Sequence, residues 1–84
     1  MEVNDAEAIR NLGACYSNGS HGLTQDYNKA LELWHKAAKL GNALSYYNIG
    51  DAHYFGKGVE RDEKKAVHYF ELAAMGGDVI ARRN

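Results

Sequence analysis

Apolar side chains recur at helical spacing in four stretches of the chain, and polar side chains occupy most of the positions between them. In the first stretch Ala8, Leu12 and Tyr16 are four residues apart, which places them on one face of a helix. In the second stretch Ala30 and Trp34 share a face in the same way. The pattern predicts four amphipathic helices, and we expect these faces to form the core. The predicted helices span approximately residues 5–18, 26–40, 43–55 and 62–75.

Residues that favour helix ends flank these stretches. Asp26 and Asp62 precede the second and fourth helices, where a carboxylate can accept hydrogen bonds from free backbone N–H groups. Gly41 follows the second helix as a stop. Gly13 and Gly50 instead fall within helices, where glycine costs about 1 kcal/mol relative to alanine. A cost that occurs twice predicts that a neighbouring helix approaches closely at both positions.

The second half of the chain repeats the first, at an offset of about 37 residues and then about 36. The offset changes in the loop between the first two helices, where Ser20 and His21 stand opposite Lys57 alone. We expect the extra residue to bulge into solvent. The matched positions are Leu12-Gly13 with Ile49-Gly50, Gly19 with Gly56, Asp26 with Asp62, Lys29-Ala30 with Lys65-Ala66, Trp34 with Phe70, Ala37-Ala38 with Ala73-Ala74, and Gly41 with Gly77.

The repeat divides the chain into a first unit at 5–41, a second at 42–77, and the first turns of a third at 78–84. The last unit stops early, so we expect the chain to be a piece of a longer array. Val79 and Ile80 would lack a partner helix, and an uncapped repeat end exposes apolar surface. The resulting hypothesis is self-association through the C-terminal end.

The recurring positions resemble the Sel-one-like repeat (SLR) family. The resemblance covers nearly the whole chain and implies an all-α fold, an α/α solenoid related to tetratricopeptide repeats. It also implies an adaptor that holds other proteins in a complex; some members act in membrane-protein degradation, and some bacterial members are cysteine-rich and secreted. This chain departs from the last group because it lacks cysteine pairs. It departs as well at His53, where the pattern expects a tyrosine like Tyr16.

Composition narrows the classes of partner and compartment. The hydrophobic fraction is 45% and the charged fraction 25%, as in soluble globular chains. A net charge of −1 predicts no nucleic-acid partner, and no apolar run is long enough to predict membrane insertion. The single cysteine rules out an intramolecular disulfide and favours a reducing compartment, although the localisation itself is not specified.

Candidate chemistry concentrates in the loop "YSNGSHGLTQD" at 16–26 and near Cys15. A phosphate-binding loop needs a preceding strand and a Lys-Ser/Thr pair, whereas a helix precedes this loop and Asp26 opens the next one, so the glycines are interpreted as a turn. A Cys15 thiolate is disfavoured at a helix C-terminus. Zinc binding by Cys15 with His21 or His53 lacks a clear fourth ligand, and the histidines are interpreted as surface residues. We predict no catalytic residue, metal or cofactor.

The first helix of each repeat lines the concave face in this architecture. That face carries aromatic and arginine side chains, which are enriched at binding sites. The predicted function is a protein–protein interaction module for a protein or peptide partner; the alternatives are a structural spacer and, third, an enzyme or metal protein. Tyr54 and Phe55 have a second interpretation, in which they fill space left by His53. The candidate partner-binding residues are Glu7, Arg10, Asn18, Tyr47, Asp51, Tyr54, Phe55 and Arg83.

Overall fold

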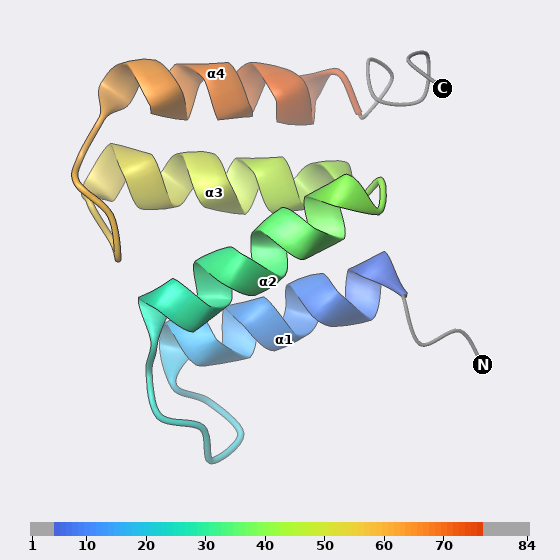
Figure 1. Cartoon of the computed structure of the whole chain (residues 1–84), viewed down its shortest axis with the longest axis vertical. Helices are drawn as coiled ribbons and strands as arrows, with labels where there is room; N and C mark the ends of the chain where they lie inside the picture. Colours follow the sequence, from blue (N-terminus) through green and yellow to red (C-terminus); the bar gives the residue numbers. More distant parts are fainter. Residues whose placement is uncertain (1–4, 77–84) are drawn as a thin grey trace.

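The predicted helices are all present, and they follow one another as antiparallel neighbours (Figure 1). A computed structural model describes residues 5–76 of the chain. Its helices α1 and α2 form one hairpin, α3 and α4 form a second, and α2 packs on α3 to join the two. The fold is therefore an all-α solenoid, with no strand in the described part of the chain. The helices are α1 (Ala6–Asn18), α2 (Tyr27–Lys39), α3 (Ala43–Phe55) and α4 (Glu63–Ala74).

A short polar side chain starts every helix. Asp26 accepts a hydrogen bond from the backbone N–H of Lys29, and Asp62 accepts one from that of Lys65, both at 3.1 Å. These caps satisfy N–H groups that have no partner within the helix. The four capping residues are Asp5, Asp26, Asn42 and Asp62.

The loops inside the two hairpins close in the same way despite their different lengths. The backbone N–H of Asp26 donates to the carbonyl of Tyr16, and that of Asp62 donates to the carbonyl of His53, both at 2.8 Å. The extra residue of the longer loop is absorbed between these ends. His21 is exposed there, as expected, and has a φ of 57°, a left-handed conformation that few residues other than glycine adopt.

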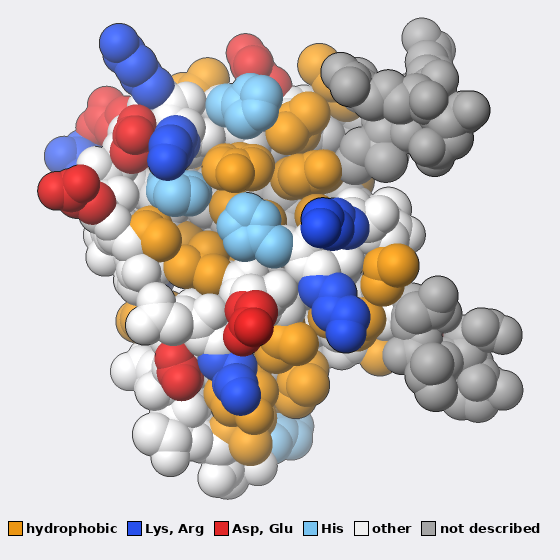
Figure 2. Space-filling view, viewed as in Figure 1, with side chains coloured by type: hydrophobic (Ala, Val, Ile, Leu, Met, Phe, Trp, Pro, Cys, Tyr) orange, Lys and Arg blue, Asp and Glu red, His pale blue; other side chains and the backbone are white. Residues whose placement is uncertain are grey.

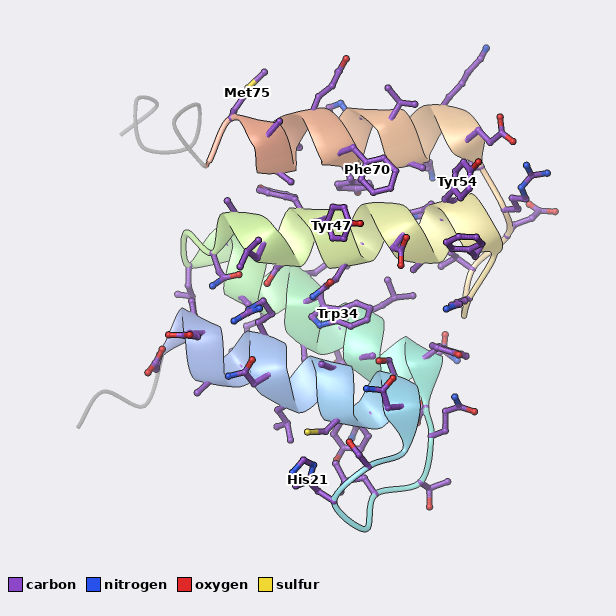
Figure 3. The ribbon with its side chains drawn as sticks, turned by 180° about the vertical axis from the view of Figure 1, so that it is seen from behind. His21, Trp34, Tyr47, Tyr54, Phe70 and Met75 are labelled. Atoms are coloured by element: carbon purple, nitrogen blue, oxygen red, sulfur yellow. The ribbon has the colours of Figure 1, made fainter. Side chains whose placement is uncertain are left out.

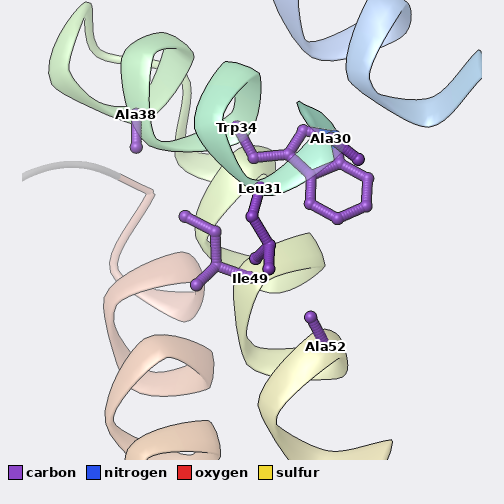
Figure 4. Packing of buried hydrophobic residues seen from close by; sticks show 6 residues of the cluster. All are labelled: Ala30, Leu31, Trp34, Ala38, Ile49 and Ala52. Carbon is purple, nitrogen blue, oxygen red and sulfur yellow. The ribbon is translucent and has the colours of Figure 1, made fainter. Parts of the chain in front are cut away.

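The core lies around α2, which is packed on both sides (Figure 4). The indole of Trp34 lies against α1, and its Nε1 donates to the carbonyl of Arg10 at 3.2 Å. Both helical glycines sit where a neighbouring ring approaches closely: Gly13 beneath Trp34, and Gly50 beneath Phe70. The expected close packing at these positions is confirmed. The core cluster consists of Ala30, Leu31, Trp34, Ala38, Ile49 and Ala52.

Three expectations about burial are wrong. Ala8 and Leu12 were expected in the core but are exposed, because no described helix packs over that face of α1. Phe70 was expected in the core as the repeat equivalent of Trp34 but is only half-buried, because among the described helices α4 packs mainly on α3. His53 is buried rather than on the surface, because its imidazole stacks on the ring of Tyr69 at 5.5 Å.

The described helices include none that is both long and apolar enough to cross a membrane.

Candidate interaction surface

A hollow of about 190 Å³ lies between α1 and α3, with Trp34 of α2 among its lining residues. We refer to it as the α1–α3 groove. Figure 3 views this side of the molecule, with α1 and α3 toward the reader and Trp34 between them. The groove combines apolar surface with hydroxyl, amide, carboxylate and ammonium groups. Its lining residues are Ala14, Ser17, Asn18, Tyr27, Trp34, Asn48, Asp51, Ala52 and Lys57.

Several elements bring these polar groups together. Asn48 and Asp51 are three residues apart on α3, so they lie on one face of the helix. Asn18 comes from the last turn of α1, and Tyr27 from the first turn of α2. Lys57 follows Gly56, the residue that ends α3 and turns the chain back toward the groove. The groove is therefore built from both repeats and does not belong to either one alone.

Aromatic rings are also exposed along α3, the helix that lines one side of the groove. The ring of Tyr47 lies 5.4 Å from that of Phe70 and remains half exposed to solvent (Figure 3). Farther along the helix, the rings of Tyr54 and Phe55 meet edge to face at 4.9 Å. Tyr54 and Phe55 are both exposed, so the interpretation that they fill space left by His53 is wrong.

Two cations cover this aromatic pair. The ammonium group of Lys57 lies 5.4 Å from the centre of the Phe55 ring, and the guanidinium of Arg61 lies 5.9 Å from that of Tyr54. The Nε of Arg61 also donates to the backbone carbonyl of Tyr54 at 3.1 Å. Cations held over ring faces keep the aromatic side chains oriented while leaving part of their surface free.

The candidate residues divide among these features. Asn18 and Asp51 line the groove, whereas Tyr47, Tyr54 and Phe55 are exposed along α3.

The remaining three candidates lie elsewhere. Glu7 is exposed and forms an ion pair with Arg10 at 3.7 Å, and the Arg10 side chain is only 20% exposed. Its Nε is buried and has no hydrogen-bond partner among the described residues. Arg83 lies outside the described residues.

Four polar lining residues were not among the candidates: Ser17, Tyr27, Asn48 and Lys57. The sequence contained a signal for Asn48, because it precedes the candidate Asp51 by one helical turn. Tyr27 and Lys57 reach the groove through the loops that end at α2 and follow α3. Their approach depends on tertiary packing, which periodicity does not report.

Of the two Cys–His pairs that were considered for zinc and set aside, the structure brings one together. The Sγ of Cys15 lies 3.3 Å from Nδ1 of His21, a hydrogen-bond contact across the α1–α2 loop. His53 packs instead against Tyr69 of α4. Within residues 5–76, no group of three or more histidine, cysteine or acidic side chains is placed to hold a metal ion.

Histidines gather around Tyr69 on the opposite side of the molecule, where Figure 2 shows them among hydrophobic side chains. His53 stacks on the Tyr69 ring, and His35 of α2 meets it edge-on at 6.1 Å. Burial, followed by the charge of Lys65, lowers the pKa of His53, and Asp62 opposes this shift.

The pKa of His35 is also lowered. Burial is the largest cause, and the positive charges of His53 and Lys39 follow. Both imidazoles therefore resist protonation in the folded protein.

Comparison with known proteins identifies the family of this chain. The model of the Sel1 repeat family matches residues 6–42 and again residues 43–78. The chain belongs to the Sel1 repeat family. The family resemblance and the all-α solenoid predicted from the repeats are both confirmed.

Sequence relatives of this chain are much longer proteins. It is 42% identical to protein sel-1 homolog 2 of Rattus norvegicus over 63% of this chain and 8% of that protein. It is 36% identical to the ERAD-associated E3 ubiquitin-protein ligase component HRD3B of Arabidopsis thaliana, over 79% of this chain and 11% of that protein. The chain therefore spans about a tenth of the length of these relatives.

A solved structure has the same fold. The Sel1 repeat protein from Oxalobacter formigenes superposes with a TM-score of 0.82 at 33% identity, over 93% of this chain and 31% of that one. Sel1 repeat proteins generally act in protein–protein interaction, and the repeat itself is a non-enzymatic scaffold.

Proposed function

We propose that this Sel1 repeat unit binds an extended peptide segment of a partner protein in the α1–α3 groove. The observation that carries the proposal is the mixed lining of the groove, which combines Asn18, Asn48 and Asp51 with the apolar floor at Trp34. An extended peptide exposes backbone N–H and C=O groups, which amide and carboxylate side chains can pair. The apolar floor can take up a side chain of the same peptide.

The rings beside the groove support the same function. Tyrosine and phenylalanine are enriched in the cores of interfaces because they bury a large area at a small cost in side-chain entropy. Tyr47, Tyr54 and Phe55 are exposed on α3, the helix that supplies Asn48 and Asp51. A partner lying along α3 would reach both the rings and the polar groups.

Selection of a random peptide library on the purified chain tests the proposal whatever the sequence of the partner. We expect selected peptides to lose at least about tenfold in affinity when Asp51→Ala or Tyr54→Ala is introduced. Lys36→Ala is the matched control, since Lys36 lies on α2 away from the groove and should leave affinity unchanged. Peptides that bind the Asp51→Ala and Tyr54→Ala variants as tightly as the original chain would contradict the proposal.

A structural spacer is the second candidate function. It would set a distance between other parts of a longer protein and need no groove chemistry. A library that yields no peptide above background would favour this alternative over peptide binding.

A further inference from the structure

The internal repeat pairs each position of the first unit with an equivalent position in the second, which we call its twin. The exposure of the two side chains can therefore be compared. Leu12 of α1 is 44% exposed, whereas its twin Ile49 of α3 is 0% exposed. The difference arises because α2 packs over Ile49, while no described helix packs over Leu12. We call the face of α1 and α2 that turns away from the second repeat their outer face. It is thus equivalent to the face of the second repeat that α2 covers.

At the other end of the chain, the buried position belongs to the first repeat and the exposed position to the second. Leu31 of α2 is 7% exposed because it packs toward α3, whereas its twin Val67 of α4 is 53% exposed. Ala38 is buried, and its twin Ala74 is exposed. Among the described residues, α4 therefore presents the same kind of face that α2 buries. The chain carries both halves of its own α2–α3 contact, one at each end.

The exposed half on α1 and α2 is hollowed to receive a helix. A cavity of about 310 Å³ lies there, and Figure 2 shows hydrophobic side chains with lysines beside them over α1 and α2. In the second repeat the equivalent positions include Ile49, His53 and Tyr69, and His35 of α2 contacts the ring of Tyr69. The cavity is thus the place that α2 takes in the next repeat. Its lining residues are Leu12, Tyr16, Lys29, Glu32, Leu33 and Lys36.

Charge favours α4 as the helix that fills this cavity. Glu71 occupies on α4 the position that His35 occupies on α2. Because His35 lies against Tyr69, Glu71 of a second molecule would lie against the twin of Tyr69, which is Leu33. Lys29 and Lys36 line the cavity with Leu33 and outnumber Glu32, the one carboxylate of the lining, so the Glu71 carboxylate would meet a net positive charge. Opposite charges across an interface select the register and the partner.

We infer that the outer face of α4 in one copy of this chain binds the outer face of α1 and α2 in a second copy, reproducing the α2–α3 contact between molecules. The occupant of each face is another copy of the same chain. The interface is head-to-tail, because the two surfaces are different and lie at opposite ends. Such an interface leaves both ends of the complex open, so it produces a series of oligomers rather than a closed dimer.

Sedimentation velocity over a range of concentrations tests the inference on the 84-residue chain. We expect the mean mass to rise continuously above the 9.3 kDa monomer. Leu12→Glu blocks one face, because its carboxylate would oppose Glu71 of the second molecule. Val67→Lys blocks the other, because it brings a positive charge to a face that carries Lys29 and Lys36. Each change should weaken association at least about tenfold. Leu44→Glu is the matched control, because Leu44 of α3 is also exposed but belongs to neither face.

Mixing the two blocked variants gives the decisive measurement. The Leu12→Glu chain keeps its α4 face and the Val67→Lys chain keeps its α1–α2 face, so an equimolar mixture should form a dimer and nothing larger. If the mixture forms this dimer, both variants are folded, so misfolding does not explain why each variant alone is monomeric.

Three results would overturn the inference. If the chain stays monomeric at every concentration, the two faces do not bind a second copy, and a different protein or another repeat would cover them. One blocked variant that associates normally indicates pairing of identical faces. A wild-type mass that stops at a dimer indicates exchange of a terminal segment.

Discussion

Gly13 lies directly beneath the indole of Trp34, and a Cβ at this position would come within 2.7 Å of Nε1. The indole cannot move aside easily, because it is buried and its Nε1 is held by the carbonyl of Arg10. Gly50 has the same relation to Phe70, with a Cβ at 2.8 Å from the ring. Glycine is thus required at both places by the approach of a neighbouring ring.

The Gly13→Ala variant should therefore be less stable, by about 1–3 kcal/mol, because an added methyl group overpacks the contact between α1 and α2. The loss should appear even though alanine is the better helix former. Gly50→Ala should cost less, because the half-buried Phe70 ring has room to shift toward solvent. Urea unfolding measures both, and Asn11→Ala on the exposed side of α1 is the control. If Gly13→Ala is as stable as wild type, glycine is not required at this position.

Removing a capping carboxylate should weaken each hairpin by a similar amount. Asp26→Ala and Asp62→Ala should each lower the free energy of unfolding by about 1 kcal/mol, because an N–H group of the following helix loses its acceptor. Asp26→Asn and Asp62→Asn keep an oxygen acceptor and should remain within a few tenths of wild type. If the asparagine variants lose as much as the alanine variants, charge rather than capping explains the loss.

Stability should decrease as the pH falls through the histidine range. The pKa of His53 and that of His35 are lowered below 6.5 in the folded protein, so on acidification the unfolded chain takes up protons first. Their contribution is complete above about pH 6.5 and is lost as the pH falls toward the folded-state pKa values. Thermal unfolding between pH 8 and pH 5.5 should show a falling midpoint.

The His53→Tyr variant separates this effect from general acid sensitivity. Tyrosine is the residue of the first repeat at this position, and it does not titrate in this range. We expect it to remove more than half of the fall in midpoint. A His53→Tyr chain with the full pH dependence would assign the effect to other groups.

Deletion of His21 should leave the protein nearly unchanged. The shorter loop of the second repeat makes the same closing hydrogen bond, so the loop can lose one exposed residue without pulling on α1 or α2. The midpoint should shift by less than about 4 °C, which corresponds to under 1 kcal/mol in a domain of this size. Deletion of the half-buried Leu23 is the control and should cost more. A large loss on deleting His21 would mean that its contact with Cys15 stabilises the loop.

The sequence by itself determined the helices, the caps of the second and fourth helices, and the repeat. These features depend on local chemistry, such as the helical spacing around Trp34 or the carboxylates of Asp26 and Asp62 beside free N–H groups. The two helical glycines also indicated close packing correctly, because a cost that recurs at Gly13 and Gly50 needs a shared cause. The family followed from the same recurring positions.

Tertiary structure alone decided which apolar residues are buried and which residues share a groove. Leu12 and Ile49 have the same place in the repeat, yet only Ile49 is covered, because burial depends on the neighbouring helix and not on helical phase. His53 is buried because the Tyr69 ring of another helix stacks on it. Tyr27 and Lys57 join Asn18 and Asp51 only after the hairpins pack, since contacts between distant segments carry no periodic signal in the sequence.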